Sequence, residues 1–146
     1  MPRRLSRFLI LTGLVGLVLT GCGTRNKFLG TWESELDVLG QHLTVTHEFK
    51  PDLAYHASAG SAGITASVTG TYSFTAEKLT ISGKNLEVKD DGSVLARMLV
   101  DKARTELEKR MKSAQTGSVE WRSDTEFAVQ PDEPGVPLVV FRKKSS

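Results

Sequence analysis

The strongest constraint on the fold is the stretch from Ile64 to Thr75, in which two kinds of side chain alternate without interruption. The first kind is apolar or small and comprises Ile64, Ala66, Val68, Gly70, Tyr72 and Phe74. The second kind carries a hydroxyl group at every position and comprises Thr65, Ser67, Thr69, Thr71, Ser73 and Thr75. Because successive side chains of a strand point to opposite faces of a sheet, the stretch predicts a half-buried β-strand. Gly70 in its middle indicates a bulge or a sharp bend.

The same two-residue period recurs in shorter segments after residue 28. These segments are 31–36, 43–50, 79–81, 119–121, 127–129 and 136–141. Short turns separate them, for example at Pro51-Asp52 and Ser123-Asp124. Strands joined by short turns favour an antiparallel meander, and about eight such strands close into a small barrel without free sheet edges. The chain is therefore expected to be mainly β.

One segment has a helical period instead. Residues 94–114 contain no Gly or Pro, and their apolar side chains recur at helical spacing. These side chains are Ala96, Val100, Ala103, Leu107, Met111 and Ala114. With Ser93 as a suitable N-cap, we expect an amphipathic helix inserted among the strands. Its polar face mixes both signs of charge, which favours packing on its own domain; docking on a partner or a membrane surface is the alternative.

The first residues have the three-part organisation of an export signal. A basic start is followed over residues 8–19 by an uncharged apolar run that is too short to span a bilayer comfortably. The run ends in Leu19-Thr20-Gly21-Cys22, which resembles the lipobox of bacterial lipoproteins. The resemblance implies a signal peptide over residues 1–21, cleavage before Cys22, and a lipid anchor on that cysteine with acyl chains such as palmitate.

Cys22 is the only cysteine, so the chain forms no internal disulfide, and lipidation would consume its thiol. Residues 22–27 are expected to be a short polar tether and residues 28–146 one domain, held in the cell envelope and facing the periplasm or the exterior. In lipoproteins of double-membrane bacteria an Asp after the cysteine often retains the protein at the inner membrane. Gly23 occupies that position here, which favours the outer membrane in such a host.

Charge excludes one class of partner. Three of the 19 basic residues, Arg3, Arg4 and Arg7, precede Cys22, so the mature chain carries sixteen basic residues against 17 acidic ones. A nearly neutral domain lacks the basic footprint that nucleic acid requires. We therefore expect no nucleic-acid partner.

Several short motifs resemble those of small lipocalin-like domains. Leu29-Gly30-Thr31-Trp32 looks like the Gly-x-Trp that opens the first barrel strand of lipocalins and their relatives. Gly70-Thr71-Tyr72 resembles their Gly-x-Tyr strand, and Phe141-Arg142-Lys143 ends the chain where relatives carry a basic residue. The resemblance implies a lipocalin-like barrel whose base is closed by Gly30 and Trp32, with Arg142 over the Trp32 ring.

The chain departs from that pattern in two places. Glu48-Phe49-Lys50-Pro51-Asp52 resembles a strand and turn that usually continue with Gly, but Leu53 follows here, so the turn is expected to differ. The expected helix also precedes the last strands, whereas lipocalins carry theirs after the barrel. The prediction is thus a lipocalin-like barrel with an inserted helix rather than a lipocalin proper.

The sequence offers little for catalysis. His42 and His47 would point to opposite faces of one strand, which makes no metal site there, and no phosphate-binding loop or nucleophile motif is present. We expect a protein that is not an enzyme and needs no cofactor. His47 lies on the apolar face of its strand, where it is either a hydrogen-bonded core residue or a group that orients a ligand.

Two functions remain open. In the first, the barrel binds a small apolar ligand, for which the candidate pocket residues are His47, Phe49, Tyr72, Phe74 and Trp121. In the second, the barrel is filled and the lipoprotein docks on an envelope protein. Small inward residues such as Ala57, Ala59 and Ala66 favour room for a ligand, whereas the aromatic residues favour a filled core. Enclosed volume separates the two, since ligand pockets usually reach about 300 Å³.

Overall fold

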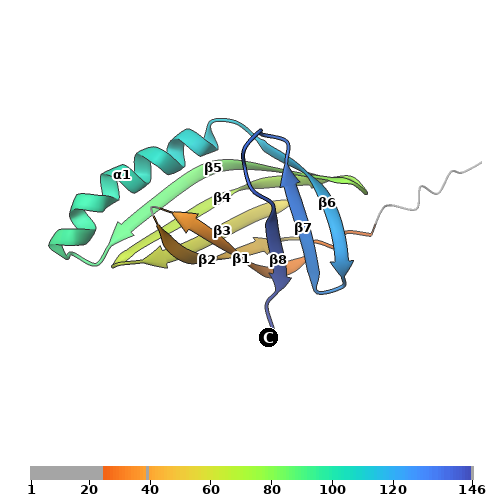
Figure 1. Ribbon diagram of the computed structural model, residues 1–146, viewed down its shortest axis with the longest axis horizontal. Helices are drawn as coiled ribbons and strands as arrows, with labels where there is room; N and C mark the ends of the chain where they lie inside the picture. The colour runs from red at the N-terminus through yellow and green to blue at the C-terminus, as the bar shows by residue number, and fades with distance from the viewer. Residues whose placement is uncertain (1–24, 39, 146) are drawn as a thin grey trace, which may run out of the picture.

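The computed structural model describes residues 25–38 and 40–145, so the expected signal peptide and Cys22 lie outside the described part of the chain. The described residues form a closed barrel of antiparallel strands with one helix, α1 (Figure 1). The elements are β1 (Gly30–Val38), β2 (Gln41–Phe49), β3 (Ala54–Ser61), β4 (Ile64–Phe74), β5 (Lys78–Asp90), α1 (Val94–Met111), β6 (Gln115–Ser123), β7 (Glu126–Pro131) and β8 (Val139–Lys143). Each strand pairs with the next and β8 pairs with β1. The expected fold class, including the inserted helix, is confirmed.

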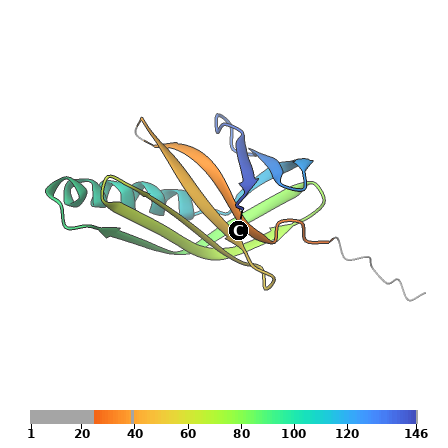
Figure 2. The ribbon, with the colours of Figure 1, turned by 90° about the horizontal axis from the view of Figure 1, so that it is seen from below.

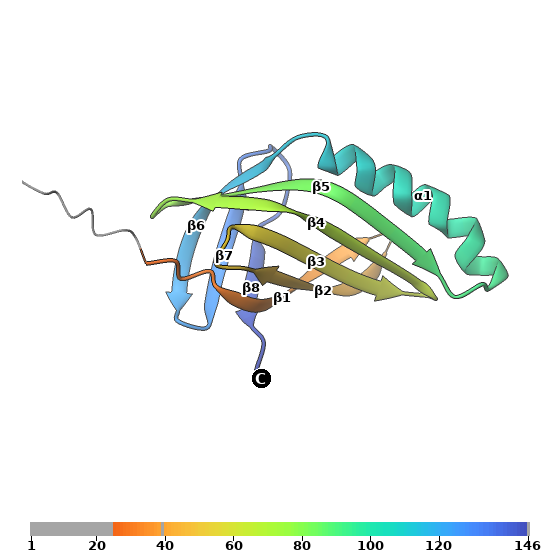
Figure 3. The ribbon, with the colours of Figure 1, turned by 180° about the vertical axis from the view of Figure 1, so that it is seen from behind.

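The ring of strands closes only at one end of the molecule. β6 pairs with just the first residues of β5, Lys78–Ile81, and β8 pairs with Trp32–Ser34 of β1. We call this closed end the base. The remaining parts of the first five strands, residues 35–38, 40–46, 58–68 and 84–90, extend beyond it as the upper section. Figure 3 shows β3, β4 and β5 running well past β6, β7 and β8, and Figure 2 shows the far ends of β1 and β2 diverging from β3 and β4.

Aromatic side chains fill the base. The buried rings are Phe28, Trp32, Phe49, Tyr55, Tyr72, Phe127 and Phe141. Phe127 and Phe141 stack with centroids 4.6 Å apart, and Trp32 meets Phe127 edge-on at 4.8 Å. Such stacked and edge-to-face contacts add to the stabilisation that burial of the rings provides. The base is therefore a packed core.

An irregularity lies beside Gly70, where a bulge or a sharp bend was expected, but its extra residue is on the partner strand. Thr69 pairs with Asn85 and Gly70 with Gly83, so Lys84 of β5 is the additional residue and β4 continues as one strand. A Cβ atom at Gly70 would collide with the backbone carbonyl of Ser82 on β5. Glycine at this position allows the two backbones to approach closely.

The turn after β2 shows how the chain accommodates Leu53. Its φ of 63° lies in the left-handed region that favours glycine, so Leu53 adopts the conformation that the usual Gly would adopt. The turn is stabilised by the Leu53 N–H, which donates to the Lys50 carbonyl at 3.1 Å, and by Asp52, whose carboxylate accepts from the Ala54 N–H at 3.1 Å.

Helix α1 begins as expected and ends earlier than expected. The Ser93 hydroxyl accepts a hydrogen bond from the Ala96 N–H at 3.2 Å, as an N-cap does. The helix ends at Met111, not at Ala114, because strand β6 already begins at Gln115 and the intervening residues make the turn. None of the helices in the described ranges is long and apolar enough to cross a bilayer.

The apolar stripe of α1 lies against the barrel only in part. The helix runs back along the part of β5 that extends beyond the base (Figures 1 and 3). Ala96 is buried, and the stripe residues Val100, Ala103, Leu107 and Met111 are half-buried. A Cβ atom at Gly83 would meet Met111 and the inward side chain of Val68, so the end of the helix leans over the inner face of the sheet. At its start, Val94, Leu95 and Met98 are exposed at 76%, 59% and 73%.

Candidate functional site

Trp32 closes the base with a lysine above its ring. The Trp32 side chain is fully buried, and its indole N–H donates to the Phe28 carbonyl at 2.6 Å. The Lys143 Nζ lies 5.5 Å from the centroid of the Trp32 ring, within cation–π range. Gly30, with φ of 115°, lies directly beside the Lys143 side chain.

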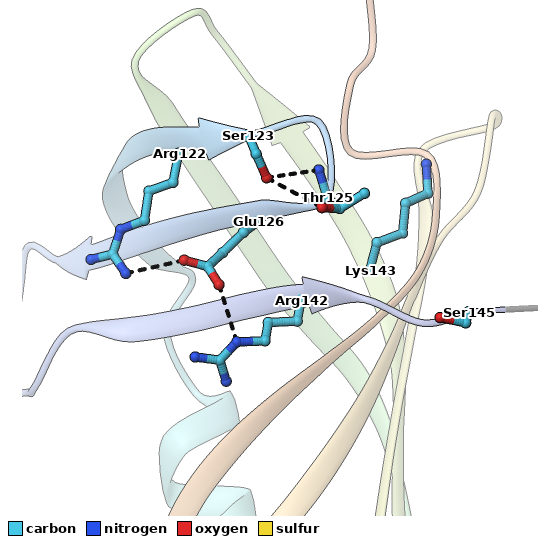
Figure 4. Close-up of a pocket in the computed structure, with 7 residues that line it drawn as sticks. All are labelled: Arg122, Ser123, Thr125, Glu126, Arg142, Lys143 and Ser145. Atoms are coloured by element: carbon cyan, nitrogen blue, oxygen red, sulfur yellow. Dashed lines mark hydrogen bonds and ion pairs between the residues drawn. The ribbon is translucent and has the colours of Figure 1, made fainter.

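The prediction that Arg142 covers Trp32 is wrong. Phe141 is buried inside the barrel, so strand alternation directs Lys143 to the same side and Arg142 to the outside. There the Arg142 guanidinium donates to the Glu126 carboxylate at 3.1 Å, and Arg122 binds the other oxygen of that carboxylate at 3.3 Å (Figure 4). Because Phe141 is buried, strand alternation determines which of Arg142 and Lys143 faces the interior.

The first described residues are fastened to the base. The Asn26 side-chain amide donates to the Tyr72 hydroxyl at 2.8 Å, and that hydroxyl donates to the Lys50 carbonyl at 2.7 Å. The Lys27 Nζ lies 5.6 Å from the centroid of the Trp121 ring. Asn26 and Lys27, which were expected to belong to the short polar tether, thus contact the folded domain.

Three of the five candidate pocket residues surround an aromatic plug, Phe28, and a fourth packs against one of them. The Phe28 ring lies 6.0 Å from Phe49, 5.5 Å from Phe74 and 5.1 Å from Trp121, between centroids. Tyr72 meets Phe49 edge-on at 5.0 Å. The structure brings these predicted residues together, but Phe28 occupies the space between them. Sequence reasoning missed the plug, although Phe28 is an apolar residue directly before the Gly-x-Trp motif.

The fifth candidate, His47, belongs to a buried polar triad. Its Nε2 is 2.8 Å from the Ser34 hydroxyl, and its Nδ1 is 2.6 Å from the Tyr55 hydroxyl. All three side chains are buried. If Tyr55 donates to Nδ1 and the Nε2–H donates to Ser34, a neutral imidazole has both ring nitrogens satisfied. The sequence placed Ser34 and His47 on inward faces, but Tyr55 carried no signal that it would reach His47.

Burial sets the protonation of the triad. Desolvation lowers the pKa of His47 to about 4 and raises the pKa of Tyr55 above its ordinary value. Both groups are therefore neutral near pH 7. With Nε2 on a serine and Nδ1 on a third group, the connectivity is that of a hydrolytic triad, but Tyr55 takes the place of the carboxylate that stabilises an imidazolium.

The surroundings of Ser34 also argue against a role as nucleophile. An imidazole whose pKa is about 4 is a weak general base at neutral pH. Ser34 lies in β1 between two paired strands, opposite Val45 of β2 and Phe141 of β8, so nearby backbone N–H groups serve the sheet. Acyl transfer needs such donors to face the developing oxyanion. The triad is better suited to binding than to catalysis.

Above the triad, the inner face of the barrel is apolar and incompletely covered. Val45 lies opposite Ala59, Ala59 opposite Ala66, and Val68 opposite Leu86, so their side chains form neighbouring rows on one face. All five side chains are half-buried, in contrast with the fully buried rings of the base, whereas Val88, opposite Ala66 on the same face, is buried. The two walls of the upper section therefore leave apolar surface within reach of solvent.

Two hollows lie outside the barrel. One, of about 520 Å³, is bounded by the β6–β7 turn and the end of β8, with Arg122, Glu126 and Arg142 in its lining (Figure 4). The other, of about 330 Å³, lies at the β3–β4 turn and the end of β5. Within residues 25–38 and 40–145, no cluster of three or more His, Cys, Asp or Glu residues is arranged to hold a metal.

No protein-family model matches the chain, and no curated protein has a significantly similar sequence.

Proposed function

We propose that the chain is a membrane-anchored envelope lipoprotein, without enzymatic activity, that binds a small apolar ligand on the inner face of the upper section. One observation carries the proposal: the interior is filled with rings in the base, whereas Val45, Ala59, Ala66, Val68 and Leu86 above it are apolar and only half-buried. Apolar surface that is left facing water in this way is stabilised by an apolar guest, at about 25 cal/mol for each Å² covered.

Residue size supports a guest in this place. Ala57, Ala59 and Ala66 stand where larger side chains would fill the space, and Leu36 and Leu43 of the diverging β1–β2 hairpin lie on the facing wall. The site is an incompletely covered inner face, bordered by α1, and not a sealed cavity. A ligand would therefore bind by covering the alanine rows and by packing against the helix.

The polar triad supplies a second feature of a ligand site. It lies at the boundary between the filled base and the upper section, since Ser34 is paired with Val45 and His47 with Ala57. Apolar binding sites commonly contain a few polar groups that orient the ligand. The hydroxyls of Ser34 and Tyr55 keep lone pairs that are free to accept a hydrogen bond from a polar end group of the ligand.

The test compares two tryptophan substitutions that face opposite ways on β4. Ala66→Trp fills the inner face, whereas Ser67→Trp adds the same ring to the outer face. Binding is followed with an anilinonaphthalene probe and its displacement by long-chain fatty acids, fatty alcohols and lysophospholipids. We expect saturable probe binding to the wild type, about ten-fold weaker binding to Ala66→Trp, a loss of about 1.4 kcal/mol, and unchanged binding to Ser67→Trp.

Equal binding to both variants, or no saturable binding to the wild type, contradicts the proposal. Thermal unfolding of each variant identifies any loss that is due to misfolding. If Ala66→Trp does not fold, probe binding to Ala59→Leu tests the same face, because this substitution on the neighbouring strand adds a smaller side chain there.

A second candidate function rests on a different observation. Val94, Leu95 and Met98 expose apolar surface at the start of α1, and exposed apolar clusters often mark docking surfaces. In this function the lipoprotein presents α1 to an envelope protein, and the barrel is a scaffold. Leu95→Asp would then abolish one specific crosslink in intact cells while leaving probe binding to the upper section intact.

A further inference from the structure

The lipid anchor and the base are close neighbours along the chain. The folded domain is fastened from Asn26 onward, through the hydrogen bond to Tyr72 and the Phe28 plug. Only residues 23–25 separate Cys22 from Asn26. At about 3.5 Å per residue, four steps along the chain span no more than about 14 Å. A bilayer that holds Cys22 therefore lies within about 14 Å of Asn26, at the base end of the barrel.

The side of the base beside this anchor point is rich in cations. The N-terminal segment contributes Arg25 and Lys27, the β6–β7 hairpin contributes Arg122, and the end of the chain contributes Arg142, Lys143 and Lys144; we call these six residues the basic sector. Three acidic residues accompany them. Glu126 is bound by Arg122 and Arg142, Glu33 pairs with Lys144 at 3.0 Å, and Asp124 is exposed in the β6–β7 turn.

Three cations of the sector are free to bind a further anion. Within the described ranges, Arg25, Lys27 and Lys143 form no ion pair, and all three are exposed. The ammonium groups of Lys27 and Lys143 instead lie over the rings of Trp121 and Trp32. Lys143 extends from β8 toward the N-terminal segment, on the side away from Arg142 (Figure 4).

Unpaired cations also occur elsewhere on the molecule. Arg110 of α1 pairs with Glu106, but the described residues show no ion pair for Arg97, Lys102, Arg104, Lys109 and Lys112 on α1 and the turn after it. At the other turns of the base, Asp52 and Glu77 add negative charge. The basic sector is therefore distinguished by its place, on the side of the base from which the tether leaves, and not by its number of unpaired cations.

We infer that the basic sector is a membrane-facing surface that binds the anionic phosphate headgroups of the bilayer in which Cys22 is anchored. Basic residues next to an anchor add to membrane binding when the lipid surface is negative. Binding there would hold the barrel upright, with the upper section directed away from the lipid. The inference rests on the proposed lipidation and is independent of ligand binding.

The test uses the mature, lipidated protein in vesicles of phosphatidylcholine, alone or with a third of phosphatidylglycerol. Acyl chains brominated near the headgroup quench tryptophans that approach the membrane. The chain has two tryptophans, of which Trp32 is fully buried and Trp121 is half-buried at the base. The ratio between brominated and unbrominated vesicles removes any direct effect of a substitution on fluorescence. We expect the quenched fraction to rise at least about two-fold with anionic lipid and to fall again in high salt.

The variant pair separates this surface from net charge. Lys27→Glu combined with Lys143→Glu should abolish the rise, whereas Lys84→Glu combined with Lys102→Glu, on β5 and α1, changes the net charge equally and should preserve it. A rise that survives the first pair, is lost in the second, or is absent from the wild type overturns the inference.

Flotation with neutral vesicles reports the anchor separately. A wild-type chain that does not float refutes the anchor and the inference together. A chain that floats, and binds the apolar probe, but shows no response to anionic lipid refutes the inference alone.

Discussion

His47 is a neutral imidazole inside a barrel whose base is otherwise aromatic. Its ring nitrogens meet only hydroxyl groups, those of Ser34 and Tyr55, so no carboxylate is at hand to stabilise an imidazolium. Protonation would place an unpaired charge next to Phe141, whose ring centroid is 4.8 Å away. This is the physical reason that its pKa lies well below that of a solvated histidine.

The folded state should therefore lose stability in mild acid. Between pH 6.5, the ordinary pKa of histidine, and pH 4, the unfolded chain binds a proton at His47 that the folded chain does not bind. The free energy of unfolding should fall as the pH falls through this window, by about 3 kcal/mol in total from this group. His47→Gln should flatten the profile. Urea denaturation at pH 7, 6, 5 and 4 measures it.

His56 provides the matched control for the acid profile. It lies on β3, is half-buried, and forms no part of the triad, so His56→Gln should retain the slope of the wild type. Carboxylates that titrate in the same window affect all three proteins alike. If His47→Gln and wild type keep parallel profiles down to pH 4, His47 is not the neutral buried group described here.

Among single residues, the sequence located Trp32 and Gly30 correctly but not the cation above them. The last strand carries the adjacent basic residues Arg142 and Lys143, and the sequence motif does not state which of the two faces inward. Strand parity does, once Phe141 is known to be buried. Tyr55 could not be placed beside His47, because that contact depends on the register of β2 against β3, with Phe49 opposite Tyr55.

At the scale of elements, α1 is a helix with two apolar surfaces. One is the half-buried stripe of Val100, Ala103, Leu107 and Met111 on the barrel, and the other is the exposed group at its start. Exposed apolar residues near a helix end do not contribute to packing. The stability of the helix therefore depends on the stripe and on the Ser93 cap.

Two aspartate substitutions distinguish these surfaces. Leu107→Asp places a charge against β5 and should lower the free energy of unfolding by about 2 kcal/mol. Leu95→Asp, in the exposed first turn, should change it by no more than about 0.5 kcal/mol, since it buries nothing and a negative charge suits a helix N-terminus. Thermal and urea unfolding of both variants provide the measurement. A Leu107→Asp protein that unfolds like the wild type would show that α1 is not packed on the barrel.

The periods of the sequence predicted which strands and helix form, but they did not predict the residue at which each element ends. The uninterrupted alternation of residues 64–75 and the helical spacing after Ser93 correspond to β4 and α1, whose positions agree with expectation. The end of α1 was misplaced because Ala114 fits the helical stripe, although the chain must already turn to bring Gln115 beside Ile81. The local sequence pattern does not show where the chain must turn in order to pair with a distant strand.

For the whole molecule, the meander and its closure followed from short turns and alternating strands, whereas the division into a filled base and an open upper section did not. That division arises because β5 extends far beyond its pairing with β6, and strand length in the middle of a barrel is not set by any one motif. The same division determines where a ligand could bind. The predicted aromatic residues lie in the filled base, and the half-buried alanines lie above them.

The proposed processing at Cys22 matters for the whole molecule, because a lipid anchor there would define which end of the barrel faces a membrane. In the lipoproteins that the first 22 residues resemble, the signal peptidase cuts only after the cysteine has been lipidated. Cys22→Ser should therefore accumulate as the uncut precursor, heavier than the mature protein by the whole of residues 1–21 and unlabelled by palmitate. Intact mass decides the outcome, because an uncut apolar segment could by itself carry the chain into detergent. Thr24→Ser, two residues beyond the cut, should be processed and labelled like the wild type. A Cys22→Ser protein of mature mass, or a wild type that takes up no palmitate, would remove the lipid anchor from this molecule and with it the membrane-facing role of the base.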